Sequence, residues 1–188
     1  IYLEVGAERV RAGLERLGLG RGPTLGVEGA EGGALPPLEA WNGFAGVTYA
    51  MGTALTATPL ELTSAYAAIA NDGVRIEPTL DGVAGAETRV LSAATARRVR
   101  EMLVHAVEDE GATGRNARVS GLQVAGKTGT AMVEDDGVRA LFVGIVPADA
   151  PRYVIYVDAE IGEDRPGFHG GSVAAPAFAR IAARIAER

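Results

Sequence analysis

The sequence contains no cysteine, which excludes disulfides, thiolate catalysis and cysteine-ligated metal sites. The compartment stays open, because a secreted protein can also lack cysteine. Long apolar runs are missing too. None reaches the roughly 18 residues that a membrane span needs, and no basic-then-apolar leader opens the chain. We therefore expect no targeting or membrane segment within these 188 residues.

Positive charge is scarce. The chain has 18 Lys and Arg against 24 Asp and Glu, a formal net charge of -6, and the basic residues are scattered. Such a surface offers no basic stripe to nucleic acid and no polybasic patch to an anionic membrane, so neither partner is indicated. With 47% apolar and 22% charged residues, residues 1–188 are expected to form one domain or a large piece of one. Because the chain opens at Ile1 without Met, inside what reads as the approach to a helix, we expect a fragment.

Three helices are predicted in the first part of the chain, each with apolar residues at helical spacing. Gly18 stands where a left-handed residue would stop the first. Thr58-Pro59-Leu60-Glu61 is a capping box with Pro at the first helical position, and Ser92 is an N-cap. The helices are predicted to run from Ala7 to Leu17, from Pro59 to the turn Asn71-Asp72-Gly73, and from Ser92 to Glu110-Gly111.

Two side chains, those of Trp41 and His105, are predicted to have a structural or solvated role rather than a chemical one. Gly20 to Gly46 shows no sustained period and is expected to be a long loop, with the single Trp41 holding it to the core. His105 lies beside the apolar face of its helix, without a second histidine or a carboxylate at ligand spacing. We therefore predict no metal site and no cofactor.

The pattern changes from helical to extended after Gly114. Leu122 to Val133 and Arg139 to Val146 are rich in β-branched residues and are joined by the turn cluster Glu134 to Gly137, which predicts a hairpin. Tyr153 to Val157 has the length of a buried strand. A last helix is predicted from Ala174 to Glu187, with Phe178, Ile181 and Ile185 on the stripe that covers the sheet. Helices, then a meander, then a closing helix indicate an α+β fold.

One stretch fits two incompatible chemistries. Gly121 to Thr128 satisfies the phosphate-loop pattern G-x-x-x-x-G-K-T, and the apolar run that ends at Val157-Asp158 imitates a strand supplying a Mg²⁺ ligand. A phosphate loop must follow a buried strand and open a helix. Here Asn116 to Ser120 is too polar for that strand, and Gly129 to Val133 runs directly into a turn. Nucleotide binding is therefore the disfavoured interpretation, and it stays open as an alternative.

The second interpretation places Lys127 on a strand. Lys-Thr-Gly is one of three signatures of the penicillin-binding proteins and serine β-lactamases, beside Ser-x-x-Lys and Ser-x-Asn motifs. The motif alone is weak, but further segments resemble this family in the same order along the chain. The matching segments are Thr58 to Gly73, Gly126 to Ala131, Phe142-Val143-Gly144 with Pro147, and Gly170 to Phe178.

The resemblance implies a truncated penicillin-binding protein/serine β-lactamase-like transpeptidase fold. The chain looks closest to class B penicillin-binding proteins, and among them to the division type. Such enzymes crosslink peptidoglycan stem peptides that end in D-Ala-D-Ala through a serine acyl-enzyme, and β-lactams acylate the same serine. The parent protein is then expected to be anchored in the cytoplasmic membrane, with this domain on the periplasmic or extracellular side, in a division or elongation complex.

Site residues also follow from the resemblance. Lys127 would place an ammonium beside the substrate carboxylate and a serine of the middle motif. The hydroxyls of Thr128 and Thr130 would hydrogen-bond that carboxylate. Gly129 would leave room for a peptide along the strand, and the backbone N–H of Thr130 would be one of two oxyanion donors. The alternative role of Lys127 is that of a solvated residue protecting an edge strand.

The sequence departs from the family in its serines. Ser64, Ser92, Ser120 and Ser172 are the four serines, and none begins a Ser-x-x-Lys or Ser-x-Asn motif. In the family these motifs and two strands lie N-terminal to everything seen here, so residues 1–188 are expected to be the C-terminal portion of a single transpeptidase domain that lacks its nucleophile. A non-catalytic transpeptidase-like module that binds peptidoglycan or division partners remains an alternative. His169 has no predicted role.

Overall fold

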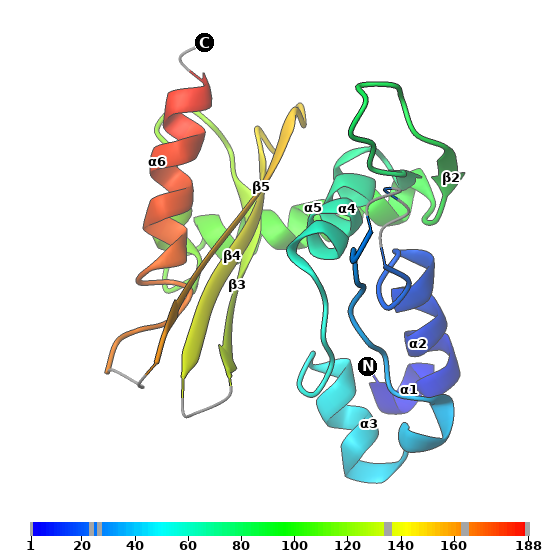
Figure 1. Ribbon diagram of the computed structural model, residues 1–188. Coiled ribbons are helices and arrows are strands. Elements are labelled where there is room, and N and C mark those ends of the chain that lie inside the picture. The colour runs from blue at the N-terminus through cyan, green and yellow to red at the C-terminus, as the bar shows by residue number, and fades with distance from the viewer. Residues whose placement is uncertain (1, 23–24, 26–27, 134–136, 163–165, 187–188) are drawn as a thin grey trace. The chain divides into compact units, whose positions relative to one another are not determined.

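The computed structural model describes residues 2–22, 25, 28–133, 137–162 and 166–186. The chain forms two compact units (Figure 1). The first comprises residues 1–68 and 74–90, and the second comprises residues 69–73 and 91–188. The combination of helices with an antiparallel sheet and a closing helix confirms the predicted α+β class. Within the described residues, no helix is both long enough and apolar enough to cross a membrane.

The first unit is mainly helical and contains one small sheet, in which β1 (Val74–Ile76) pairs antiparallel with β2 (Glu87–Arg89). The sequence pattern does not predict this hairpin, because three-residue strands are too short to show alternation. The predicted helix from Ala7 to Leu17 is confirmed, and Gly18 after it has φ +98°. The helices of this unit are α1 (Tyr2–Val5), α2 (Ala7–Arg16), η1 (Leu38–Ala40), α3 (Gly43–Ala50) and α4 (Pro59–Ala70), the last two residues of α4 belonging to the second unit.

The expected loop from Gly20 to Gly46 is wrong in its last part, because η1 and the start of α3 lie there. Asn42 precedes α3 without making a side-chain cap bond, and α3 carries no polar stripe, so neither usual signal marks this helix. Residues 23–24 and 26–27 of the segment lie outside the described residues. Trp41 is 3% exposed and its Nε1 donates to the Pro36 carbonyl over 3.1 Å, which confirms its predicted packing role.

The Glu61 carboxylate is buried and accepts hydrogen bonds from four backbone N–H groups. The predicted capping box forms in both directions, because the Glu61 N–H donates to Thr58 Oγ1 and the Thr58 N–H donates to Glu61 Oε2. The same carboxylate also accepts the backbone N–H groups of Gly20, Gly22 and Gly33, at 3.0, 3.3 and 2.9 Å. Burial on its own raises the pKa of Glu61, but these hydrogen bonds outweigh it, so the pKa lies below its usual value.

The second unit is built on a three-stranded antiparallel sheet of order β3-β4-β5. Its strands are β3 (Ala125–Met132), β4 (Val138–Val146) and β5 (Tyr153–Ile161), and its helices are α5 (Ala93–Glu108), η2 (Arg115–Ala117) and α6 (Ala174–Ala186). Helix α6 lies along one face of the sheet (Figure 1). The core between them is centred on Phe142 of β4 and Phe178 of α6, both fully buried, with ring centroids 4.8 Å apart.

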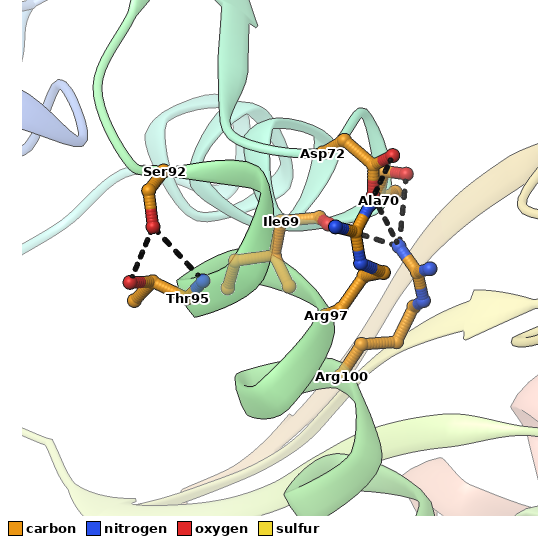
Figure 2. A network of polar contacts seen from close by, with 7 residues as sticks. All are labelled: Ile69, Ala70, Asp72, Ser92, Thr95, Arg97 and Arg100. Carbon is orange, nitrogen blue, oxygen red and sulfur yellow. Dashed lines mark hydrogen bonds and ion pairs between the residues drawn. The ribbon is translucent and has the colours of Figure 1, made fainter.

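Helix α5 is held at its first turn by side chains. The predicted N-cap is confirmed, since Ser92 Oγ accepts the Thr95 N–H over 3.1 Å (Figure 2). From the same helix, Arg100 donates to the carbonyls of Ile69 and Ala70, each over 3.3 Å. These carbonyls end α4 and lack helical partners, so the Arg100 guanidinium caps α4. Arg97 and Arg100 also pair with Asp72, at 3.2 and 3.5 Å.

Several predicted boundaries of the second unit need correction. The first strand begins at Ala125 rather than Leu122, because Leu122 turns back to pair with Val119. The third strand extends beyond Val157 to Ile161 and is half-exposed rather than buried, since only β4 pairs with it among the described residues. Ile181 is 42% exposed, and the buried side of α6 is formed by Phe178 with small residues. Residues 134–136 of the predicted turn and Glu187 lie outside the described residues.

The hydrogen bonds of Glu61 to Gly20, Gly22 and Gly33 lead to a prediction for a variant that lacks the carboxylate. Glu61→Gln keeps the shape of the side chain but replaces one accepting oxygen by an amide that cannot accept an N–H. We expect local opening of the backbone at Gly20 and Gly22, and tryptic cleavage after Arg21 about tenfold faster in the folded protein. Cleavage is followed by mass spectrometry. Glu87→Gln on the exposed strand β2 is the control, and equal rates in both variants would contradict the prediction.

Candidate active site

Lys127, Thr128, Gly129 and Thr130 all lie within β3, at the edge of the sheet. Lys127 pairs in register with Val143 of β4 and Thr130 pairs with Ala140. No helix starts at Lys127, because the strand continues to Met132. A phosphate loop needs a helix at this point, so the structure is inconsistent with the nucleotide-binding interpretation. The predicted placement of Lys127 on an edge strand is confirmed for the described residues.

Lys127 is the only lysine in the sequence, beside 17 arginines. It is exposed, and its Nζ donates to the Thr128 carbonyl over 3.1 Å and lies 3.4 Å from Thr128 Oγ1. An ammonium can lose a proton to a neighbour whereas a guanidinium cannot, so Lys127 is the one Lys or Arg side chain of the sequence that could exchange a proton. This composition signal was available in the sequence and would have strengthened the choice of Lys127.

The backbone of β3 presents polar groups to its open edge. A carbonyl that reaches Lys127 Nζ cannot also face β4, so the Thr128 carbonyl points to the open side. In an antiparallel pair, the backbone groups of alternate residues face the same side. The N–H of Thr130, two residues on, therefore faces the open edge as well. This orientation leaves the Thr130 N–H available to an acceptor outside the sheet.

Two threonine hydroxyls of β3 are engaged by segments that are distant in the sequence. Thr128 Oγ1 donates to Thr113 Oγ1 over 3.0 Å, and Thr113 lies between α5 and η2. Thr130 Oγ1 accepts the Gly170 N–H over 3.3 Å, from the segment before α6. Sequence reasoning missed Thr113 and Gly170 as neighbours of the motif. No local pattern could have found them, although Gly170 lay in a segment that carried the family resemblance.

The close approach of the Gly170 segment to the sheet depends on the absence of side chains. A Cβ on Gly170 would lie 2.3 Å from the Leu141 carbonyl oxygen and 2.6 Å from that of Gly129. A Cβ on Gly171 would lie 2.5 Å from the Thr113 carbonyl oxygen, and Asn116 Nδ2 donates to the Gly171 carbonyl over 2.8 Å. Backbone atoms cannot move aside cheaply, so glycine is required at both positions.

Where the structure describes the chain, none of the four serines lies within hydrogen-bond distance of Lys127 Nζ. Among the described residues, Lys127 Nζ has hydrogen-bond partners only on Thr128. Ser172 holds its own loop together, since its Oγ lies within hydrogen-bond distance of the Gly167 and His169 carbonyls and accepts the His169 N–H. His169 gains no role from these contacts. The site therefore offers a cation, hydroxyls and a free N–H, which suit the binding of an anion and of a developing oxyanion.

The expectation that no carboxylate lies at ligand spacing from His105 is wrong. Asp109 lies four residues on, and its Oδ1 is 3.0 Å from His105 Nδ1. This contact raises the pKa of His105. Both side chains are largely exposed, and within the described residues no three His, Cys, Asp or Glu side chains gather as a metal site would require.

Comparisons with known proteins place these features in context. A family model described as penicillin binding protein transpeptidase domain matches residues 1–183. The chain is 36% identical to penicillin-binding protein PbpB of Mycolicibacterium smegmatis, covering 98% of this chain and 32% of that protein. It is 32% identical to peptidoglycan D,D-transpeptidase FtsI of Escherichia coli, covering 88% and 29%. The crystal structure of penicillin binding protein 3 from Mycobacterium tuberculosis, complexed with aztreonam, is similar with a TM-score of 0.86 at 35% identity, over 99% of this chain and 47% of that one.

Two glycines of β3 predict different responses to substitution. A Cβ on Gly126 would lie 2.4 Å from the buried ring of Phe142, whereas the atoms nearest to a Cβ on Gly129 belong to the side chain of Leu141, at 2.9 Å. Gly126→Ala should therefore destabilise the protein by about 1–3 kcal/mol through overpacking. Gly129→Ala should cost under about 1 kcal/mol, because the Leu141 side chain can turn away. Thermal unfolding compares the two, and equal melting temperatures would refute the packing argument.

Proposed function

This chain belongs to the penicillin-binding protein transpeptidase family, and we propose that it is the C-terminal portion of the transpeptidase domain of a peptidoglycan D,D-transpeptidase. In this proposal the parent enzyme crosslinks stem peptides ending in D-Ala-D-Ala through a serine acyl-enzyme and is acylated by β-lactams. The serine lies outside residues 1–188. The observation that carries the proposal is the open edge of β3, with its single lysine and outward-facing Thr130 N–H.

The piece is small beside the proteins that it resembles. The chain spans about a third of the length of the curated relatives that it matches. The half-exposed strand β5, which only β4 pairs among the described residues, supports a sheet completed by further strands of the parent protein. We propose that the parent is anchored in the cytoplasmic membrane with this domain outside it, in a division or elongation complex, as the resemblance of its motifs to class B penicillin-binding proteins implies.

Each group at the β3 edge has a defined part in this reaction. The Lys127 ammonium attracts the substrate carboxylate and exchanges a proton with a serine supplied by the rest of the enzyme. The Thr130 hydroxyl donates to the carboxylate, and the Thr128 hydroxyl helps to orient the site through its hydrogen bonds to Lys127 and Thr113. The Thr130 N–H donates to the oxyanion that forms when the nucleophile attacks the carbonyl. Gly129 adds no side chain along the edge, so an extended peptide can pair with the strand.

Labelling by a fluorescent penicillin tests the assignment of the nucleophile. The 188-residue chain should not be labelled, because none of its four serines stands in a Ser-x-x-Lys motif. The full-length parent protein should be labelled covalently, and the label should survive denaturing electrophoresis. Labelling of the short chain would show that the nucleophile is misplaced. An unlabelled parent protein would instead favour a non-catalytic module that binds peptidoglycan.

Substitution of Lys127 tests its role in the parent protein. Lys127→Ala should slow acylation at least about a hundredfold, because both the anion-binding charge and the proton carrier are lost. Its melting temperature should change little, since the side chain is exposed. Lys127→Arg keeps the charge but cannot exchange the proton, and should also be slow. Arg98→Ala, an exposed substitution on α5, is the control. Normal acylation of Lys127→Ala would identify Lys127 as a solvated edge residue.

A further inference from the structure

The hydroxyl of Thr113 lies in a row of polar groups along β3, which also contains Lys127 Nζ and the hydroxyls of Thr128 and Thr130. It lies 3.0 Å from Thr128 Oγ1, and Thr128 Oγ1 lies 3.4 Å from Lys127 Nζ. On the other side of Thr128, the hydroxyl of Thr130 accepts the Gly170 N–H. Five groups from three separate segments of the chain therefore line one edge of the sheet.

The direction of these hydrogen bonds decides which protons are available. An ammonium can only donate, so Thr128 Oγ1 accepts from Lys127 Nζ and turns its own proton to Thr113. Thr113 Oγ1 is then an acceptor in this bond, and its proton has no acceptor among the described residues. The Thr130 hydroxyl also acts as an acceptor, from the Gly170 N–H, and its proton likewise has no acceptor among the described residues. The row thus keeps two hydroxyl donors, on Thr113 and Thr130, while Thr128 is the link between Lys127 and Thr113.

The backbone around Thr113 is fixed by packing. The next residue, Gly114, is buried and its N–H donates to the Ala106 carbonyl over 3.1 Å, extending the end of α5. A Cβ on Gly114 would lie 2.8 Å from that same oxygen, so the chain passes close to α5. The Thr113 carbonyl in turn lies against Gly171, whose own carbonyl is held by Asn116. The Thr113 hydroxyl is therefore presented by a rigid backbone although it is exposed.

We propose that Thr113 is a further substrate-binding residue, whose hydroxyl donates a hydrogen bond to the carboxylate of the substrate or of a β-lactam. The inference rests on the proposed function. It assigns to Thr113 a share of the carboxylate contact that the motif itself would give to Thr128. The two free hydroxyl donors flank Thr128, and the Lys127 ammonium supplies the opposite charge.

Acylation of the full-length parent protein by a penicillin and by its methyl ester tests this proposal. The methyl ester lacks the anionic carboxylate, so an interaction with that group affects the free acid alone. Thr113→Val removes the hydroxyl and keeps the shape, and should slow acylation by the free acid about tenfold. The rate with the methyl ester should stay within about twofold, since no hydrogen bond to a charged group is lost. Thr113→Ser, which keeps the hydroxyl, should react with the free acid at a rate close to that of the unsubstituted protein.

Two controls separate the possible outcomes. Thr88→Val, on the exposed strand β2, should change neither rate. Thr113→Ala should give the same selective loss if Thr113→Val lowers the melting temperature. Equal slowing with both compounds, or no slowing with the free acid, would refute the role of Thr113 and leave the proposed function intact. An unsubstituted parent protein that fails to react with the free acid would refute the proposed function, and this inference with it.

Discussion

The packing of Phe142 into the space left by two glycines is the constraint on which the site depends. Gly126 of β3 and Gly144 of β4 both lie against this ring, and a Cβ on either would come within 2.8 Å of it. Phe178 of α6 closes the same space from the helix side. Because protein interiors are close-packed, this arrangement fixes β3 on β4. The residue that follows Gly126 is Lys127, so the core determines where the lysine emerges at the edge of the sheet.

The open edge of β3 brings together groups with different origins. The backbone alternation of the strand directs the Thr130 N–H outward, and the Thr128 carbonyl holds the Lys127 ammonium on the same side. The hydroxyls depend on neighbours outside the strand, since Thr113 and Gly170 set the direction of their protons. Glycines at 170 and 171 let these neighbours approach the sheet closely. Which hydroxyls at the β3 edge can donate a hydrogen bond therefore depends on three segments of the chain and not on the Lys-Thr-Gly motif alone.

The first unit uses a different means of holding irregular backbone. One buried carboxylate, that of Glu61, accepts N–H groups from the capping box and from the glycine-rich segment that follows α2. A buried carboxylate is costly unless it is fully hydrogen-bonded, and here it has enough donors to stay ionised. Glu61 thus holds the glycine-rich backbone that follows α2 and also caps the first turn of α4.

The sequence by itself determined the features that depend on neighbours in the chain. The capping box at Thr58, the N-cap at Ser92 and the strand that carries Lys127 follow from residues within a few positions of each other, and the structure has all three. Only the tertiary structure decided which groups surround them. Thr113 is 15 positions from Thr128, Gly170 is 40 from Thr130, and Gly20 is 41 from Glu61. Contacts at such separations leave no periodic trace in the sequence, because they depend on how the core packs rather than on local backbone preference.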